Sequence, residues 1–200
     1  MFRHRLGAAP LVGALAAAAC VAVAAAHAAG RPDLHTVDWN RATLPGSVCG
    51  ADRPIVLHTG SATVRSHRWP AFARVSVDRG RVVYGDLNGD GRDEAALQVV
   101  CANLGGTAAG QLGFAVVVYT PGARAPRVVG VLTPTIRTPG RHVPILVPTS
   151  ITRDEVTVTE YVYGPRDGDC CPSGRARAVW RLKDGALRPA STRLQKQPSA

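Results

Sequence analysis

The sequence predicts an all-β protein, a single compact antiparallel β domain built as a sandwich or a strongly curved sheet, with little helix. Stretches of strand length, rich in Val, Tyr and Thr, recur between turn signals made of Gly, Pro, Asp and Asn. Several of these stretches alternate apolar and polar residues, as half-buried strands do. No long segment repeats its apolar residues with the helical period of about 3.6 residues.

Residues 1–28 have the order of a secretory signal peptide. Arg3 and Arg5 precede an apolar run, and "AHA" at 26–28 matches an A-x-A cleavage site, so we expect cleavage after Ala28. The run is rich in alanine and short of the roughly 20 strongly apolar residues that a membrane span needs. We therefore expect a secreted or extracytoplasmic protein with no transmembrane span in its mature form.

Cys20 offers an alternative, in which this cysteine is lipidated and anchors the chain to a membrane. A lipoprotein signal usually carries leucine three residues before the cysteine. Ala17 occupies that place here, and the apolar sequence continues past Cys20. Lipid anchoring is therefore the less favoured interpretation.

Residues 29–46 are expected to lead into the domain and to become ordered near Trp39, and residues 47–188 to form the β domain. "FARVSV" (72–77) alternates, "DRG" is a short turn, and "RVVYGD" (81–86) is predicted to return as the partner strand of a hairpin. Residues 95–101 and 114–120 are continuous apolar runs. They predict central strands that are buried on both faces.

The second half of the β domain reads as a set of half-buried strands. "VPILVP" (143–148) is predicted to be an edge strand, because proline cannot donate to a strand ladder. "EVTVTEYVY" (155–163) and "RARAVWRL" (175–182) alternate, and the second should direct inward Ala176, Ala178, Trp180 and Leu182. Residues 189–200 are polar and are predicted to form a loose tail.

Four cysteines, Cys49, Cys101, Cys170 and Cys171, remain after signal-peptide removal. In an exported protein they predict disulfide bonds, and four cysteines allow three pairings. We favour Cys49 with Cys101, which ties the leading segment to a central strand, and Cys170 with Cys171. Pairing of the first two with the two adjacent cysteines stays open.

The net charge is +10, and removal of Arg3 and Arg5 leaves +8. A basic protein is attracted to anionic polymers. The arginines are spread along the chain without a run of five, so the charge gives little evidence for a specific partner. We expect an envelope or extracellular partner and, because of export, no nucleic acid; the oligomeric state stays open.

The stretch "YGDLNGDGRDEAAL" (84–97) has the residue spacing of a calcium-binding loop. Calcium takes about six to eight oxygen ligands, which a tight loop supplies from alternate positions. The predicted ligands are the side chains of Asp86, Asn88, Asp90 and Glu94 and the carbonyl of Arg92, with Gly91 at the sharp turn. An EF-hand would need Glu where this chain has Leu97. The alternative is a metal-free turn of Asn, Asp and Gly.

The loop resembles the "DxNxDGxxD" loops of VCBS and FG-GAP repeats, with Glu94 in place of the final Asp. Only one copy occurs, which argues against a propeller of repeats. Over residues 37–188, the order of "VDWNRATLPG…CG", the loop, "FAVVVYT" and "DCCPSG…AVWRLKDGAL" is similar to small exported actinobacterial proteins of the LppP/LprE-type lipoprotein family and its secreted relatives. That resemblance implies a cell-envelope location and brings no known activity.

The sequence lacks the G-x-S-x-G, H-E-x-x-H and S-x-x-K signatures of hydrolases. Ser61 lies close to His58 in the chain, but catalytic triads assemble from distant segments. We therefore expect a non-catalytic secreted or envelope-associated β domain with a structural calcium loop, which binds an unidentified partner or ligand. Two alternatives stay open, namely a structural protein of the cell-wall surface held by its basic charge and an unrecognised extracytoplasmic hydrolase.

Overall fold

The structure is a computed structural model that describes residues 32–69, 72–105, 110–137 and 142–195. The predicted signal peptide, including Cys20, lies outside these residues. The unit Pro32–Ala200 is built from antiparallel strands, and its helices within the described ranges are 3-10 turns of three residues each. The predicted all-β class is confirmed. No helix of the described residues is long and apolar enough to cross a membrane.

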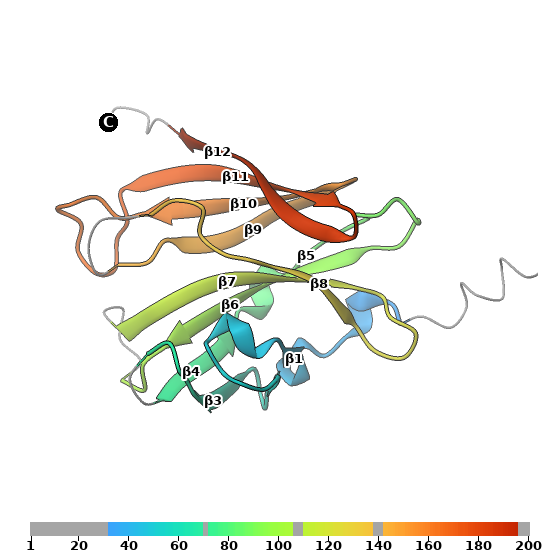
Figure 1. Cartoon of the computed structure of the whole chain (residues 1–200), viewed down its shortest axis with the longest axis horizontal. Coiled ribbons are helices and arrows are strands. Elements are labelled where there is room, and N and C mark those ends of the chain that lie inside the picture. The colour runs from blue at the N-terminus through green and yellow to red at the C-terminus, as the bar shows by residue number, and fades with distance from the viewer. Residues whose placement is uncertain (1–31, 70–71, 106–109, 138–141, 196–200) are drawn as a thin grey trace, which may run out of the picture. The chain divides into compact units, whose positions relative to one another are not determined.

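Two large sheets and one small ribbon make up the fold (Figure 1). The six-stranded sheet has the order β3-β4-β6-β7-β8, with β5 also paired to β6, and consists of β3 (Ser61–Arg65), β4 (Phe72–Val77), β5 (Val83–Gly85), β6 (Glu94–Ala102), β7 (Gln111–Thr120) and β8 (Arg127–Leu132). The four-stranded sheet has the order β12-β11-β10-β9 and consists of β9 (Ile145–Thr152), β10 (Glu155–Val162), β11 (Gly174–Lys183) and β12 (Ala186–Gln195). The ribbon pairs β1 (Thr43–Leu44) with β2 (Ile55–Val56).

The two large sheets pack face to face. Valines at alternate positions of β7 meet Val156 and Val158 of β10 and Trp180 of β11 in one apolar cluster. The sheets therefore form a sandwich, in which the four-stranded sheet covers one face of the six-stranded sheet. The inward direction predicted for Ala178, Trp180 and Leu182 agrees with this cluster.

The leading segment, which in the described chain is residues 32–48, covers the opposite face of the six-stranded sheet. It contains the short helices η1 (Leu34–Thr36), η2 (Trp39–Arg41) and η3 (Gly46–Val48). Trp39 packs with Leu97 of β6 and Tyr119 of β7 in a second apolar cluster. Strands β6 and β7 are consequently buried on both faces, as their continuous apolar runs predict.

Two predictions about the strands are wrong. Strands β4 and β5 do not form a hairpin, because both pair with β6: Val77 lies opposite Val99, and Val83 opposite Ala96. Between them, the Asp78 carboxylate accepts from the amide of Gly80 and starts the helix η4 (Arg79–Arg81), so the chain makes one helical turn instead of reversing.

The second wrong prediction concerns the polar tail. Residues 189–195 are not loose, because β12 runs to Gln195 and pairs with β11 along its length. Ladder hydrogen bonds hold this strand, whose side chains are mostly exposed. The final residues, 196–200, are outside the described part of the chain. The predicted edge position of residues 143–148 agrees with β9, which lies at the end of the four-stranded sheet.

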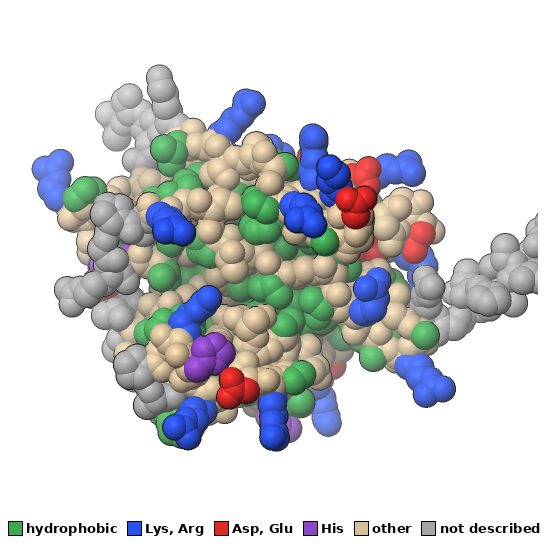
Figure 2. Space-filling model, in the orientation of Figure 1, with side chains coloured by type: hydrophobic (Ala, Val, Ile, Leu, Met, Phe, Trp, Pro, Cys, Tyr) green, Lys and Arg blue, Asp and Glu red, His purple; other side chains and the backbone are tan. Residues whose placement is uncertain are grey.

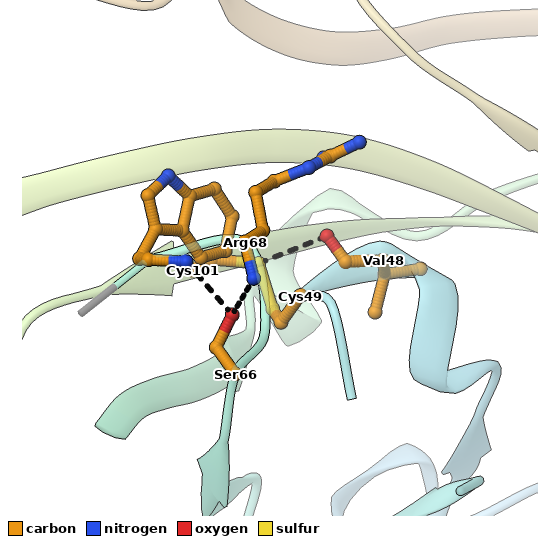
Figure 3. The surroundings of a disulfide bond; sticks show 6 residues. Val48, Cys49, Ser66, Arg68 and Cys101 are labelled. Carbon is orange, nitrogen blue, oxygen red and sulfur yellow. Dashed lines mark hydrogen bonds between the residues drawn. A yellow bond between two sulfur atoms is a disulfide. The ribbon is translucent and has the colours of Figure 1, made fainter. Parts of the chain in front are cut away.

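The disulfides pair Cys49 with Cys101 and Cys170 with Cys171, the pairs that the sequence favours. Cys49 follows η3 and Cys101 lies in β6, so the first bond fastens the leading segment to the six-stranded sheet (Figure 3). Both sulfurs are fully buried. The Cys101 Sγ lies 3.2 Å from the Val48 carbonyl oxygen. A disulfide sulfur has no proton to donate, so this is a packing contact.

Candidate functional site

The loop 86–94 joins β5 to β6 and is rooted in the core of the sandwich. Leu87 is 1% exposed and belongs to the cluster between the two sheets. Its carbonyl accepts from the amide of Asp154 at 2.8 Å, in the turn between β9 and β10. The loop is therefore held by both sheets at its first apolar residue.

Asp86 organises the tip of the loop. Its Oδ1 accepts from the amides of Gly89 at 2.7 Å and Asp90 at 3.1 Å, and its Oδ2 accepts from Gly91 at 2.9 Å. Gly89 and Gly91 have φ angles of 75° and 80°, in the region that favours glycine. A methyl group on Gly89 would also lie 2.8 Å from the Arg153 Nη2, so this glycine lets a guanidinium approach the loop backbone.

The next two predicted ligands continue the same pattern of local turns. The Asn88 Oδ1 accepts from the amide of Asp90 at 2.8 Å, and the Asp90 Oδ1 accepts from the amide of Arg92 at 3.0 Å. Both side chains are exposed. Aspartate and asparagine form such turns with the backbone two residues ahead, which explains why they alternate here.

Glu94 lies beneath the loop and is 1% exposed. Its Oε2 accepts from the amide of Leu87 at 2.7 Å, while Oε1 accepts from the Thr120 hydroxyl at 2.6 Å and the Asn88 amide nitrogen at 3.0 Å. Burial raises the pKa of this carboxyl, and the nearby Asp90 raises it further, against the opposing effect of the hydrogen bonds. No salt bridge between residues of the described ranges includes Glu94.

The donor chemistry of this loop fits a hard cation. Carboxylate, amide and carbonyl oxygens are the ligands that calcium prefers, and the loop carries them at the positions a calcium loop uses. In this arrangement the side chains point at backbone amides. Among the residues that the structure describes, no three His, Cys, Asp or Glu side chains are grouped so as to hold a metal ion.

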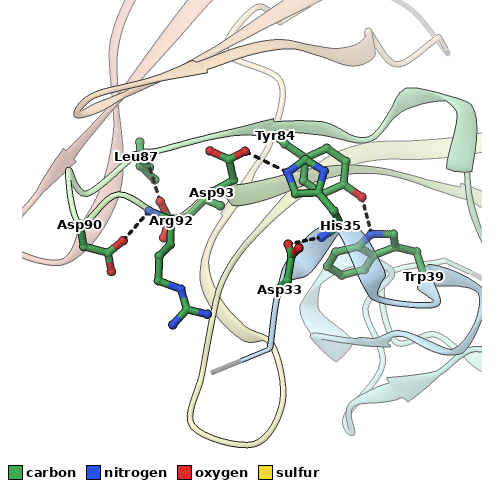
Figure 4. A network of polar contacts seen from close by, with 9 residues as sticks. Asp33, His35, Trp39, Tyr84, Leu87, Asp90, Arg92 and Asp93 are labelled. Carbon is green, nitrogen blue, oxygen red and sulfur yellow. Dashed lines mark hydrogen bonds and ion pairs between the residues drawn. The ribbon is translucent and has the colours of Figure 1, made fainter. Parts of the chain in front are cut away.

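The end of the loop, at Arg92 and Asp93, contacts the leading segment (Figure 4). The Asp93 Oδ2 lies 2.9 Å from the His35 Nε2, and the His35 ring stacks on Tyr84 at a centroid distance of 4.0 Å. The Tyr84 hydroxyl accepts from the Trp39 indole at 3.0 Å, and the Arg92 guanidinium donates to the Pro32 carbonyl at 3.4 Å. No local sequence pattern signals these contacts, because each joins segments more than forty residues apart.

A second acidic loop, 164–173, joins β10 to β11. The Asp167 Oδ2 accepts from the amides of Gly164 at 2.6 Å and Ser173 at 2.7 Å and from the Ser173 hydroxyl at 2.9 Å. Asp167 is partly exposed, and hydrogen bonds from those amides hold the pKa of its carboxyl below its usual value. The vicinal cysteines are exposed at the end of the loop.

Ser61 and His58, which are close in the sequence as a nucleophile and a base could be, lie in a tight turn. The His58 amide donates to the Ser61 carbonyl at 2.9 Å, and the Ser61 amide donates back at 3.1 Å. Between them Thr59 and Gly60 have positive φ angles, as a two-residue hairpin turn requires. The geometry of the turn accounts for their proximity.

Comparison of the chain with protein-family models, with curated proteins and with solved structures finds no match.

Proposed function

We propose that the protein is an exported, non-catalytic β-sandwich that binds a partner in the cell envelope, and that loop 86–94 holds one structural calcium ion. One observation carries the calcium assignment. Glu94 is a buried carboxylate without a cationic partner in the described ranges, at the base of a loop that carries further oxygen ligands. The export signal, the disulfides and the resemblance to the LppP/LprE-type family support the location.

The physical reason is the cost of burying negative charge. A carboxylate taken out of water needs a cation or several good hydrogen bonds, and Glu94 has three neutral donors. Asp86 and Asp90 add two further negative charges within the same loop. Asp86, Asn88, Asp90, the Arg92 carbonyl and Glu94 are the groups that would hold the ion, which supplies the missing positive charge.

The role of the ion follows from what the loop contacts. Arg92 and Asp93 contact the leading segment at Pro32 and His35, while Leu87 contacts the core between the sheets. A loop fixed by calcium would therefore fasten the start of the described chain to the sandwich. This is a stabilising role, and it leaves the binding of a partner to other surfaces.

Thermal unfolding in calcium and in chelator tests the proposal. At a calcium concentration about a hundredfold above the dissociation constant, binding to the folded state alone adds about 2.7 kcal/mol. For a domain of this size that corresponds to a rise in Tm of about 5 to 10 °C. Asp90→Ala should abolish the calcium-dependent rise.

Asp93→Ala is the matched control, because it removes one carboxylate from the same loop but not a predicted ligand. This variant should keep the calcium-dependent rise in Tm while losing the contact with His35. Equal melting of the wild-type protein in calcium and in chelator would remove calcium from the proposal, and the loop would then be a set of Asn and Asp turns.

A further inference from the structure

The outward face of the four-stranded sheet gathers arginines from two neighbouring strands. In the ladder of β11 and β12, Arg177 lies opposite Arg193, and Arg181 lies opposite Arg188. Side chains directly opposite each other project to the same side of a sheet. Arg175 lies two residues before Arg177 and projects to that side too. Leu182, Leu187 and Trp180, at the intervening positions, pack into the core.

This arginine face, defined by Arg175, Arg177, Arg181, Arg188 and Arg193, contains a hollow of about 400 Å³. The hollow is lined by Arg177, Arg181 and Arg193 together with Ser191, Val179, Ala190 and Glu155. Figure 2 shows Lys and Arg side chains projecting from the upper part of the molecule, where β11 and β12 lie. The five arginines of this face lie within nineteen positions of the sequence, from Arg175 to Arg193.

Most of these guanidiniums keep donors for a ligand. Within the described residues, only Arg181 of the five pairs with a carboxylate, through Glu155 at 2.7 Å. Arg177 donates to the Thr157 hydroxyl at 3.0 Å, and Arg175 lies over the Tyr161 ring at 5.8 Å from its centroid. Each guanidinium has five N–H donors, so these contacts leave the face rich in donors and in positive charge.

We infer that the arginine face binds a linear phosphodiester polymer of the cell envelope. Five arginines against one glutamate make the face complementary to a polyanion. The inference deepens the proposed function, since it names the surface and the chemistry of the partner. It rests on the proposed export and partner binding, and it is independent of the calcium ion.

The geometry favours phosphate over carboxylate. A carboxylate has two oxygens, which one arginine fork can satisfy. The carboxylate of Glu155 is held through one of them, because the Arg181 Nε and Nη2 lie 2.8 and 2.7 Å from its Oε1. Arg177 and Arg193 lie opposite each other in the ladder and line the hollow together with Ser191, so two guanidiniums and one hydroxyl-bearing side chain share it. A tetrahedral phosphodiester can accept from two guanidiniums and a hydroxyl at once. The alternation of Arg175 and Arg177, about 6.6 Å apart along the strand, continues the charge beyond the hollow.

Binding of the full-length chain to synthetic poly(glycerol phosphate), measured over a range of salt concentrations, tests the inference. The face variant Arg177→Gln/Arg188→Gln/Arg193→Gln should lose at least about tenfold in affinity, and its slope of log K against log salt should fall by about 2, as expected for three lost phosphate contacts. The control variant Arg65→Gln/Arg74→Gln/Arg127→Gln removes the same charge from exposed positions of the six-stranded sheet. It should stay within about twofold of wild type.

Three other results would each overturn the inference. Absence of wild-type binding removes the polymer, and an equal loss in the control variant assigns the attraction to net charge. Equal or tighter binding of poly-glutamate or of single-stranded DNA with the same number of charges would assign the face to a carboxylate polymer or to nucleic acid. The single variant Arg193→Gln, on the edge strand β12, provides a test in case the triple variant misfolds. It should lower the slope of log K against log salt by about 0.7.

The calcium test and the polymer test can fail separately. The first reads the Tm of loop variants, and the second reads polymer affinity in chelator, where no calcium ion can bridge two anions. If calcium did not raise the Tm but the polymer still bound, the calcium site would be wrong and the inference about the arginine face would stand. If calcium raised the Tm but the polymer did not bind, the calcium site would stand and the inference about the arginine face would be wrong.

Discussion

Loops 86–94 and 164–173 use the same turn chemistry in different surroundings. In each, one aspartate gathers backbone amides: Asp86 accepts from three and Asp167 from two. The first loop is rooted in the core by Leu87 and Glu94, which are each 1% exposed. The second projects from the four-stranded sheet with its acidic residues and vicinal disulfide at the surface.

The comparison shows that burial decides the electrostatic outcome of a hydrogen-bonded carboxyl. Hydrogen bonds lower the pKa of both Glu94 and Asp167. At Glu94 the cost of desolvating the charged form is larger than the hydrogen-bond effect, so the pKa rises. At Asp167, which is only partly buried, the amides of Ser173 and Gly164 prevail, so the pKa falls. A cation beside the buried Glu94 would offset this desolvation cost.

The largest expected difference between the loops concerns their anchoring. Leu87→Ala should lower the free energy of unfolding by about 2 to 5 kcal/mol, because it opens a cavity in the core between the sheets. Arg166→Ala, at an exposed position of the second loop, should change it by less than about 0.5 kcal/mol. Urea unfolding monitored by circular dichroism measures both. Similar effects of the two substitutions would show that loop 86–94 is not rooted in the core.

The sequence predicts the sheets better than their connections. Continuous apolar runs mark β6 and β7, which are packed with apolar residues on both faces, whereas alternation marks β10 and β11, which place their apolar residues on the face toward the other sheet. The error at β4 and β5 arises because a hairpin and a strand broken by a helical turn share the same local signals. A short strand at Ala186 and Leu187 can be predicted from the sequence, but its continuation over residues 189–195 cannot, because pairing to β11 holds these polar residues and no local pattern reports it.

The candidate sites divide in the same way. The rhythm of Asp86, Asn88 and Asp90 is local, so the sequence locates the loop and its turns. The contact between Asp93 and His35 and the arginine face depend on segments that meet only in the folded chain. Spread along the sequence, those arginines give the impression of a diffuse background charge. Their alternation on two paired strands is what concentrates them on one face.

An intermediate effect is expected at Glu94 when calcium is removed with chelator. Glu94→Ala leaves the Leu87 amide and the Thr120 hydroxyl without their acceptor and should cost about 2 to 4 kcal/mol of unfolding free energy. Glu94→Gln keeps one acceptor oxygen and should cost about 1 kcal/mol. Midpoints of urea unfolding separate the two substitutions.

Glu160 supplies the matched control. It is fully buried, and its carboxylate accepts from the amides of Thr135 and Ile136 and from the Thr135 hydroxyl. Glu160→Ala and Glu160→Gln should follow the same order in chelator and respond to calcium no more than the unsubstituted protein does. If Glu94→Ala were as stable as wild type in chelator, the carboxylate would not hold the loop through these hydrogen bonds.

The smallest expected effect is the pH dependence contributed by Asp167, the surface counterpart of Glu94. Its folded-state pKa is lowered from 3.8, so between the folded pKa and that value the unfolded chain binds more protons than the folded one. The free energy of unfolding therefore rises with pH across this window. The contribution is fully present above pH 3.8 and is lost as the pH falls through the folded pKa. In Asp167→Asn the charge is absent, so the stability difference from wild type should be constant at neutral pH and shrink in acid, as unfolding at about pH 7 and about pH 2.5 can show. An unchanged difference would mean that the amides of Gly164 and Ser173 do not favour the charged carboxylate, and the contrast between the exposed and the buried loop would lose its electrostatic basis.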